Sequence, residues 1–189
     1  MRLSDEFGVV VEATIPAPPQ RVWDLVADIS TSPRFSPELQ RTEWLDGAEG
    51  PAVGAHFAGH NARPDGTKWQ TVNRIIEFTP LERFAWEVLP DTATAEGDAF
   101  ARWHYEVTAD GEGTRVRHSM RMGNLRTPLH RFVEQNPEQE EALVDARLAI
   151  LREGMEAVLK GIAADAAAVD SDPAAVDSDA ADAADAARA

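Results

Sequence analysis

The sequence predicts an α+β domain in which one large antiparallel sheet packs against a long C-terminal helix. The helix is indicated by residues 136–162, where apolar residues recur every three or four positions and form one stripe. The sheet is indicated by residues 41–122, where β-branched and aromatic runs alternate with turns rich in Gly, Pro and Asp. Because the apolar stripe of so long a helix needs a broad partner, we expect it to lie against the sheet.

The long helix is expected to run from Asn136 to about Ile162. Asn136 can cap the free amides of the first turn, and Pro137 suits the first helical position because its missing N–H would have no partner there. Gly154 and Gly161 lie one heptad apart on one face, and each costs about 1 kcal/mol relative to Ala inside a helix. This face is therefore predicted either to pack closely against another element or to border an open space.

Shorter elements are predicted from Pro, Ser and Gly, which end periodic segments. Residues 7–15 form a first strand and residues 20–29 a first helix. The Ser and Pro residues of 30–37 stop that helix and allow only a short second helix before Arg41. Another short helix is expected to be capped by Thr127 and to begin at Pro128. The strands expected after the first are Arg41–Leu45, Gly54–Ala62, Lys68–Phe78, Arg83–Leu89, Phe100–Ala109 and Thr114–Met122.

The turn DGEG fixes the register of the last two strands. Pairing across this turn places Tyr105 opposite His118 and Trp103 opposite Met120 on an apolar face, while the other face is charged. A slip of one residue would mix the two faces, so this register is predicted. In the strand Lys68–Phe78 the alternation does not decide which face is inside.

Length and composition indicate one main domain. The 189 residues suffice for a single core, and the absence of Cys excludes disulfides and thiolate metal sites. No apolar run approaches the ~18 residues of a membrane span, and the N-terminus has no signal-peptide core, so a cytoplasmic protein without integral membrane association is expected. The net charge of −15 argues against nucleic acid as a partner. The sequence gives no indication of the oligomeric state.

The C-terminal segment differs in composition from the rest. From residue 163 onward the chain holds seven Asp and one Arg with almost no large apolar residues, and the word AAVDSD occurs twice. Such a segment cannot bury enough apolar surface to offset its ordering entropy. We therefore expect a folded domain over residues 1–162 and a disordered, acidic, Ala- and Asp-rich tail over residues 163–189, with continued helix up to Ala168 as an alternative.

Four sequence words resemble one protein family. They are APPQRVWDLVADISTSPRFSPE, VGAHFAGHNARPDGTKW, RFAWEV and WHYEVTADGEGTRVRH. Together they resemble the polyketide cyclase/dehydrase and lipid-transport branch of the START-like superfamily, also called SRPBCC, over residues 7–162. The resemblance implies a helix-grip fold, in which a curved antiparallel sheet of about seven strands wraps around the long C-terminal helix, with two short helices after the first strand. It also implies a cavity between sheet and helix, and an aromatic polyketide-like or lipid-like ligand.

The candidate site is an aromatic inner face with few polar groups. Asn61 and Trp69 resemble positions that recur in this branch. Because histidine titrates near neutrality, His118 and Tyr105 are the candidate catalytic acid–base couple if the cavity is open. The candidate ligand-binding residues are Phe57, Asn61, Trp69, Trp86, Trp103, Tyr105, His118 and Met155.

Each of these residues also has a structural interpretation. The tryptophans are typical of a solid core, Asn61 can cap the turn RPDG at the rim, and His118 can be a core histidine held by Tyr105. No metal or cofactor is expected, because His56 and His60 stand roughly 13 Å apart along a strand. The motifs HExxH and GxSxG and phosphate-binding glycine loops are also absent.

The sequence leaves three functions open. The first is binding of a hydrophobic small molecule, as a carrier or as an enzyme of the cyclase or dehydratase type, in which catalysis would consist of positioning a flexible chain and moving protons. The second is a protein-interaction module without a small-molecule ligand, similar to the ribosome-associating toxin or chaperone-activator relatives of this fold. The third is a domain whose cavity has collapsed.

Overall fold

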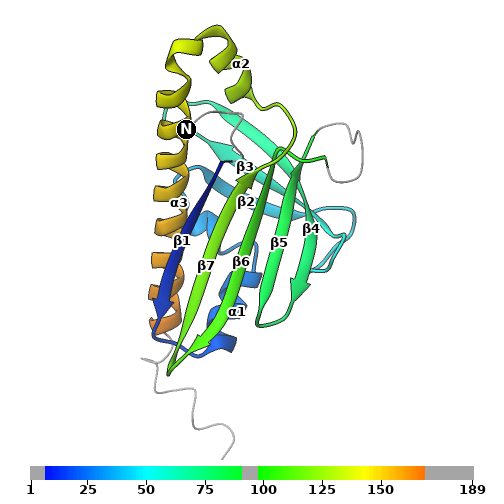
Figure 1. Ribbon diagram of the computed structural model, residues 1–189. Coiled ribbons are helices and arrows are strands. Elements are labelled where there is room, and N and C mark those ends of the chain that lie inside the picture. Colours follow the sequence, from blue (N-terminus) through cyan, green and yellow to red (C-terminus); the bar gives the residue numbers. More distant parts are fainter. Residues whose placement is uncertain (1–6, 91–97, 169–189) are drawn as a thin grey trace, which may run out of the picture.

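The computed structural model describes residues 7–90 and 98–168, which form one curled antiparallel sheet and a long helix (Figure 1). The order of the strands in the sheet is β1-β7-β6-β5-β4-β3-β2. The strands are β1 (Gly8–Ile15), β2 (Leu39–Trp44), β3 (His56–Ala62), β4 (Lys68–Thr79), β5 (Arg83–Leu89), β6 (Ala101–Asp110) and β7 (Gly113–Met122). The helices are α1 (Pro19–Ala27), α2 (Pro128–Gln135) and α3 (Glu140–Ala168), with 3-10 turns η1 (Ser32–Arg34) and η2 (Pro137–Gln139).

The predicted α+β class and helix-grip arrangement are confirmed. All seven strands begin and end within two residues of the predicted limits. The second short helix after the first strand is the single 3-10 turn η1. Helix α2 begins at Pro128 as expected, and the backbone N–H of Thr127 donates to Nδ1 of His130 at 3.1 Å.

The long helix differs from the prediction at both ends. It begins at Glu140, because Pro137–Gln139 form the 3-10 turn η2, and it continues to Ala168 rather than ending near Ile162. The extension is held by packing and charge: Ala166 is buried and Asp165 pairs with an arginine described below. The helical alternative is therefore the right one for residues 163–168, and the rest of the predicted tail lies outside the described residues.

Strand β4 contains a bulge between Ile75 and Glu77, which explains why its alternation did not reveal the inner face. Before the bulge Asn73 pairs with Phe57 and Ile75 with Trp86, so these side chains share the inner face of the sheet. The extra residue shifts the pattern by one position, as a bulge does. After it, Phe78 faces inward opposite Phe84.

The two faces of the sheet differ in charge. The register of the β6–β7 hairpin is the predicted one, with Tyr105 opposite His118 and Trp103 opposite Met120. Cross-strand pairs lead outward from Tyr105 and His118, to β1 on one side and to β2 on the other. None of the side chains that these pairs place on the same face of the described strands is Arg, Lys, Asp or Glu. The Arg, Lys, Asp and Glu side chains of the paired positions therefore lie on the outer face.

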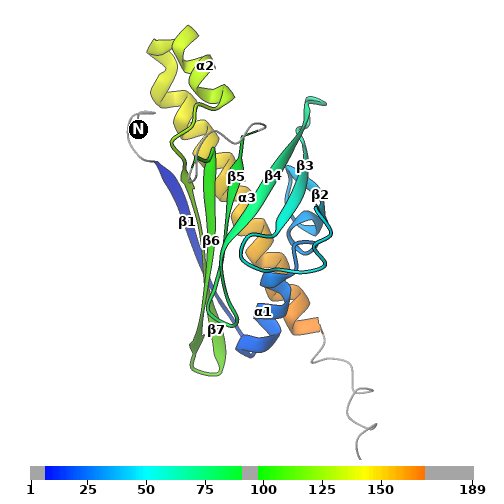
Figure 2. The same ribbon diagram turned by 90° about the vertical axis from the view of Figure 1, so that its right-hand side faces the viewer.

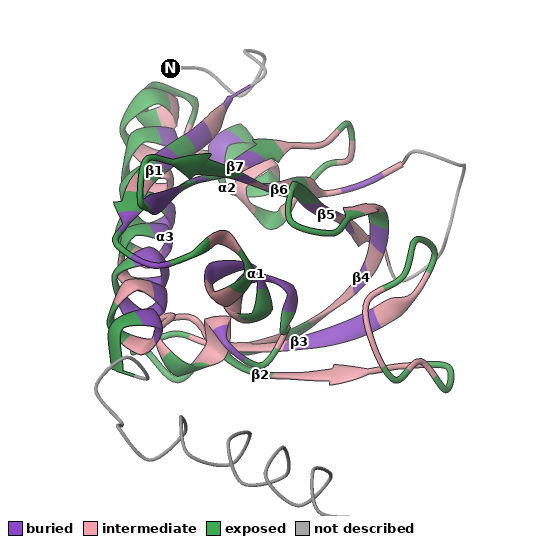
Figure 3. Ribbon diagram, turned by 90° about the horizontal axis from the view of Figure 1, so that it is seen from below, coloured by how far each residue is buried: buried purple, intermediate pink, exposed green. Residues whose placement is uncertain are grey.

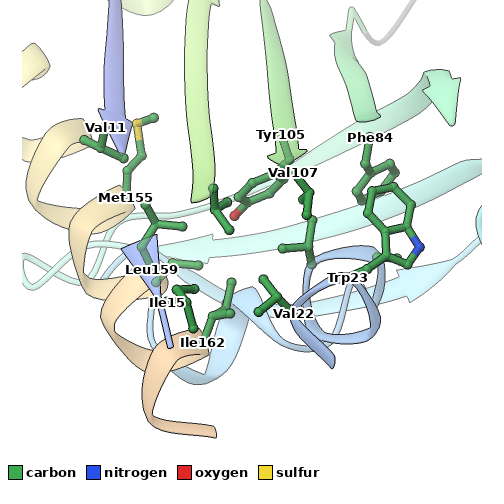
Figure 4. Packing of buried hydrophobic residues seen from close by; sticks show 14 of the residues in the cluster. Val11, Ile15, Val22, Trp23, Phe84, Tyr105, Val107, Met155, Leu159 and Ile162 are labelled. Carbon is green, nitrogen blue, oxygen red and sulfur yellow. The ribbon is translucent and has the colours of Figure 1, made fainter. Parts of the chain in front are cut away.

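Helix α1 lies inside the curl of the sheet, with α3 along one side (Figure 3). Its buried residues Val22, Trp23 and Val26 join a core that also takes in β1, β6, β7 and the C-terminal half of α3 (Figure 4). Among the strands, α3 packs mainly against β1. Helix α2 lies beyond the opposite end of the strands (Figure 2).

Two glycines on α3 leave room for residues 35–37, the segment that follows η1. A Cβ at Gly161 would lie 2.2 Å from Cγ of Phe35, so a larger residue fits only if that ring moves. A Cβ at Gly154 would meet Cδ of Pro37 at 3.5 Å, which is an ordinary contact. Close packing of this helix face is thus confirmed, and its partner is an irregular segment rather than the sheet or an open space.

Ion pairs at both ends of this segment fasten it to α3. Arg34 Nη1 lies 2.6 Å from Asp165 Oδ2, and Arg147 Nη1 lies 2.8 Å from each carboxylate oxygen of Glu38. Nε of Arg63, in the turn after β3, also donates to Glu38 at 3.4 Å. Because Glu38 directly precedes the edge strand β2, these contacts tie that edge to α3 and close the curl on this side.

Candidate functional site

The inner face carries a set of aromatic rings in mutual contact, which come from β3, β5, β6 and β7. Trp86 stacks on Trp103 with ring centroids 6.1 Å apart and planes 5° apart, and its centroid lies 6.1 Å from that of Phe57. It also contacts Tyr105 at 6.0 Å and His118 at 6.5 Å. The structure thus brings together five of the predicted site residues, which we call the aromatic wall: Phe57, Trp86, Trp103, Tyr105 and His118.

Tyr105 and His118 form the innermost pair of the aromatic wall. Their rings stack with centroids 3.9 Å apart and planes 16° apart, and their exposed fractions are 2% and 4%. Stacked rings present faces rather than polar edges to each other, so the pair is not joined by a hydrogen bond. The Tyr105 hydroxyl and both His118 ring nitrogens have no hydrogen-bond partner within the described residues. His118 is therefore a core histidine that stacks on Tyr105, but no hydrogen bond from Tyr105 satisfies its nitrogens.

Burial sets the protonation of this pair. It lowers the pKa of His118 to about 3, and the charge of His104 on the outer face contributes a smaller part in the same direction. Burial also raises the pKa of the Tyr105 hydroxyl well above its ordinary value; the nearby Ser32 side chain opposes this, although no hydrogen bond of normal geometry joins the two. Both groups are therefore neutral at pH 7, and together they can donate and accept hydrogen bonds.

Three predicted site residues lie away from this pair. Asn61 and Trp69 pair with each other across β3 and β4. The Asn61 amide donates to the Gly59 carbonyl at 3.2 Å, so it does not cap the RPDG turn as one interpretation held, and Arg63 covers the Trp69 ring at 5.0 Å. Met155 is 2% exposed and lies in the core with β1 (Figure 4).

Sequence reasoning missed two inner residues of this face. Asn73 is 4% exposed, and its amide donates to the Phe57 carbonyl at 3.1 Å. Trp44, on β2, meets Phe57 edge to face at 5.9 Å. The signal for Asn73 was its place between Thr71 and Ile75 in the alternation, but the bulge of β4 concealed which face that alternation occupies.

Within residues 7–90 and 98–168, no helix has the length and apolar character that crossing a bilayer requires. Over the same ranges, no group of three or more His, Asp or Glu side chains is placed to hold a metal ion.

Solved structures share this fold. A polyketide cyclase-like protein from Corynebacterium glutamicum has 28% sequence identity and a TM-score of 0.55, with 82% of this chain and 91% of that chain covered. A major latex-like protein from Panax ginseng has 13% identity and a TM-score of 0.57, covering 84% and 95%. A di-domain ARO/CYC protein of the steffimycin biosynthetic pathway has 16% identity and a TM-score of 0.60, covering 85% of this chain and 50% of that one.

A search of curated proteins finds no match to this chain. One family model does match, and its span takes in β1, every later strand and nearly all of α3. Because the model for polyketide cyclase/dehydrase and lipid transport proteins matches residues 6–166, the chain belongs to that family, as its sequence words indicated.

Proposed function

We propose that this protein binds an uncharged hydrophobic small molecule, aromatic polyketide-like or lipid-like, against the aromatic wall. The observation that carries this proposal is the set of three unpartnered polar atoms on Tyr105 and His118. Leaving a buried polar group without a partner costs roughly 1–3 kcal/mol. A hydroxyl or carbonyl oxygen of a ligand, placed among the rings, would supply the missing hydrogen bonds.

The charge of the inner face supports an uncharged ligand. The directly paired inner residues of the described strands include no Arg, Lys, Asp or Glu, so a buried carboxylate or ammonium group would find no opposite charge there. Burying an unpaired charge is far more costly than burying an unpaired hydroxyl. A ligand with a polar but neutral group therefore fits this face best.

Access requires movement of side chains. Tyr105 and His118 are almost fully buried, whereas Trp86 and Trp103, which contact them, are half-buried. The two tryptophans are thus the rings that a ligand meets before it reaches the polar pair. Binding would shift the two indole rings, and their fluorescence would report it.

The protonation of the pair favours binding over proton transfer. With a pKa of about 3, His118 is a weak base at pH 7, and with its raised pKa Tyr105 is a weak acid. General acid–base catalysis works best when the pKa lies near the working pH. Any cyclase or dehydratase chemistry would then rest on positioning a reactive chain, with Tyr105 and His118 holding its oxygens.

Calorimetric titration with two probes of equal size tests this proposal. Neutral 1-naphthol should bind saturably, and 1-naphthoate should bind at least about tenfold more weakly because its carboxylate finds no partner. His118→Phe and Tyr105→Phe should each weaken 1-naphthol binding, while the outward-facing control Ser119→Ala should not. Asn61→Ala and Trp69→Phe then test whether the ligand extends to β3 and β4.

Two outcomes would refute the proposal. One is the absence of saturable binding for either probe, with folding of the protein verified by circular dichroism. The other is 1-naphthol binding that the changes at His118 and Tyr105 leave untouched. Equal affinity for 1-naphthoate would refute the claim that the ligand is uncharged.

A further inference from the structure

A surface hollow of about 320 Å³ lies between α1 and the loop that follows β2, apart from the Tyr105–His118 pair. Two tryptophans and small apolar residues form its walls, and three carboxylates border it. We call it the α1–β2 hollow. Its lining residues are Trp23, Asp24, Ala27, Asp28, Ile29, Trp44, Glu49, Gly50 and Pro51.

The aromatic side of the hollow is rigidly held. Trp23 is 5% exposed and packs on Phe78 with ring centroids 5.6 Å apart, and Trp44 packs on Phe57 at 5.9 Å. The Trp23 indole N–H makes no hydrogen bond within the described residues. Its nitrogen points away from the aliphatic core (Figure 4). The Trp23 side chain as a whole is nearly buried, and its indole N–H at the wall of the hollow is thus available to an acceptor on a ligand.

The acidic side of the hollow carries negative charge without a cation. Asp24 accepts a hydrogen bond from Gln20 at 2.7 Å, and the two oxygens of Asp28 accept from Ser30 N–H and Oγ–H at 2.8 Å each. Within the described residues, neither these two carboxylates nor Glu49 form an ion pair, and no Lys or Arg lines the hollow. Their charge therefore faces the hollow uncompensated by the protein.

We propose that the α1–β2 hollow binds a small organic cation, namely an alkyl- or arylammonium ion with a nearby hydroxyl or ether oxygen. The half-buried Trp44 ring attracts a cation through its quadrupole and covers the apolar body of the ligand, while the nearly buried Trp23 contributes its indole N–H. The carboxylates attract the same charge, and the oxygen accepts the Trp23 N–H. Metal ions fit this hollow less well, because its walls are largely aromatic and metals such as Mg²⁺ and Ca²⁺ take oxygen ligands.

This site is separate from the aromatic wall, and its occupancy does not depend on the proposed function. Trp44 and Phe57 link the two regions by ring contact, but their charge preferences are opposite. The directly paired inner residues of the described strands include no Arg, Lys, Asp or Glu, whereas three carboxylates border the hollow. A ligand that is neutral suits the first, and a ligand that is cationic suits the second.

Nitrogen–proton NMR of the five indole groups can test the proposal directly. Titration with benzyltrimethylammonium chloride should shift the Trp23 and Trp44 indole signals saturably and leave the Trp69 signal in place. Benzyl alcohol and phenylacetate, which have the same ring without the positive charge, should not saturate in the same range. Single substitutions Trp23→Phe and Trp44→Phe assign the signals.

The carboxylates are tested by neutral replacements that keep their shape. Asp24→Asn, Asp28→Asn and Glu49→Gln should each raise the Kd for the cation by about two- to fivefold, as expected for a partly exposed charge pair. The three changes together should raise it more than tenfold. Glu153→Gln, an exposed position on α3, is the matched control and should leave the Kd unchanged.

The Trp23 donor is tested with a second cation. Benzyl(2-hydroxyethyl)dimethylammonium should bind more tightly than benzyltrimethylammonium, and Trp23→Phe should remove that difference. Benzyl alcohol binding as tightly as the cations, or unchanged affinity in the triple carboxylate variant, would overturn the proposal. Equal losses with Glu153→Gln would also overturn it, because the attraction would then come from the net charge of the protein and not from the hollow.

Discussion

The two faces of the sheet differ in whether their polar side chains have partners within the protein. On the outer face Arg117 Nη1 lies 3.0 Å from Glu12 and its Nε lies 3.6 Å from Glu106. The Glu87 side chain, only 3% exposed, pairs with Arg74 and with Arg102. This carboxylate also offsets the unfavourable position of Arg102 opposite another arginine in the register.

On the inner face the buried polar atoms of Tyr105 and His118 have no hydrogen-bond partner of normal geometry within the described residues. Both faces belong to the same strands, so irregular strand pairing does not explain the difference. The sheet thus pairs a buried outer carboxylate, whereas three inner polar atoms, and Nε2 of His104 on the outer face, have no hydrogen-bond partner within the described residues. Under the proposed function a ligand would supply the partners of the three inner atoms. Four experiments can break or sharpen this comparison.

The largest loss of stability is expected when a carboxylate is placed on the inner face, and the same change on the outer face is the comparison. Val107→Asp puts a carboxylate on the inner face, where Val107 is 4% exposed, and should lower the free energy of unfolding by about 3–5 kcal/mol. Thr108→Asp puts the same charge on the exposed outer face, opposite Arg115, and should change stability by less than about 0.5 kcal/mol. Urea unfolding measures both. Similar losses in the two variants would mean that the faces are not distinct.

The pH dependence of stability tests the buried histidine. In the folded protein the pKa of His118 is lowered to about 3, while in the unfolded chain it is ordinary, so only the unfolded chain binds this proton between pH 6.5 and 3. Stability should therefore fall as the pH drops through 6.5, by about 2 kcal/mol at pH 5 from this group alone. Urea unfolding at pH 8 and pH 5 should show that His118→Phe loses less stability on acidification than the natural protein. Identical losses would mean that His118 is not buried in its neutral form.

Removing the inner hydroxyl should have opposite effects on stability and on binding. Tyr105→Phe deletes an unpartnered buried group and should raise the free energy of unfolding by about 1 kcal/mol. The same variant should bind 1-naphthol about five- to tenfold more weakly, since one hydrogen bond is lost. Ser32→Ala is the control, because the Ser32 side chain lies near the Tyr105 hydroxyl. If Ser32→Ala and Tyr105→Phe lowered the free energy of unfolding by similar amounts, Ser32 would already be the hydrogen-bond partner of that hydroxyl.

The smallest effect is expected on the outer face. Glu12→Gln removes one partner of Arg117, and both side chains are about half exposed, at 49% and 46%. Thermal unfolding should show a loss of at most about 1 kcal/mol, which shrinks further in high salt. A loss as large as that of the inner-face charge would contradict the assignment of this face to solvent.

Much of this architecture could be predicted because local signals agreed. The DGEG hairpin has one register that keeps Tyr105 and His118 on the apolar face, and any slip mixes the faces. The start of α2 followed from Thr127 and Pro128, whose preferences act within one turn. These features depend on neighbours in sequence or on strict alternation.

What could not be predicted depends on contacts between distant residues. The bulge in β4 is set by pairing with β5, so the inner position of Asn73 was concealed. The spacing of Gly154 and Gly161 predicted close packing, but their partner segment 35–37 lies more than a hundred residues earlier in the chain. The missing partners of His118 could not be foreseen either, because the sequence does not state which polar groups a core leaves unpaired.

The same distant contacts impose an order on folding during synthesis. In the described sheet the edge strand β1, made first, pairs with the last strand, β7, and the segment 35–37 finds its partner on α3 only when that helix has been made. Closing such long loops is costly in entropy and slow compared with local structure formation. Until α3 has been synthesised, the contacts by which it closes the curl cannot form, so that side of the inner face lacks its cover. A hydrophobic ligand or a chaperone could then reach that face before the helix docks.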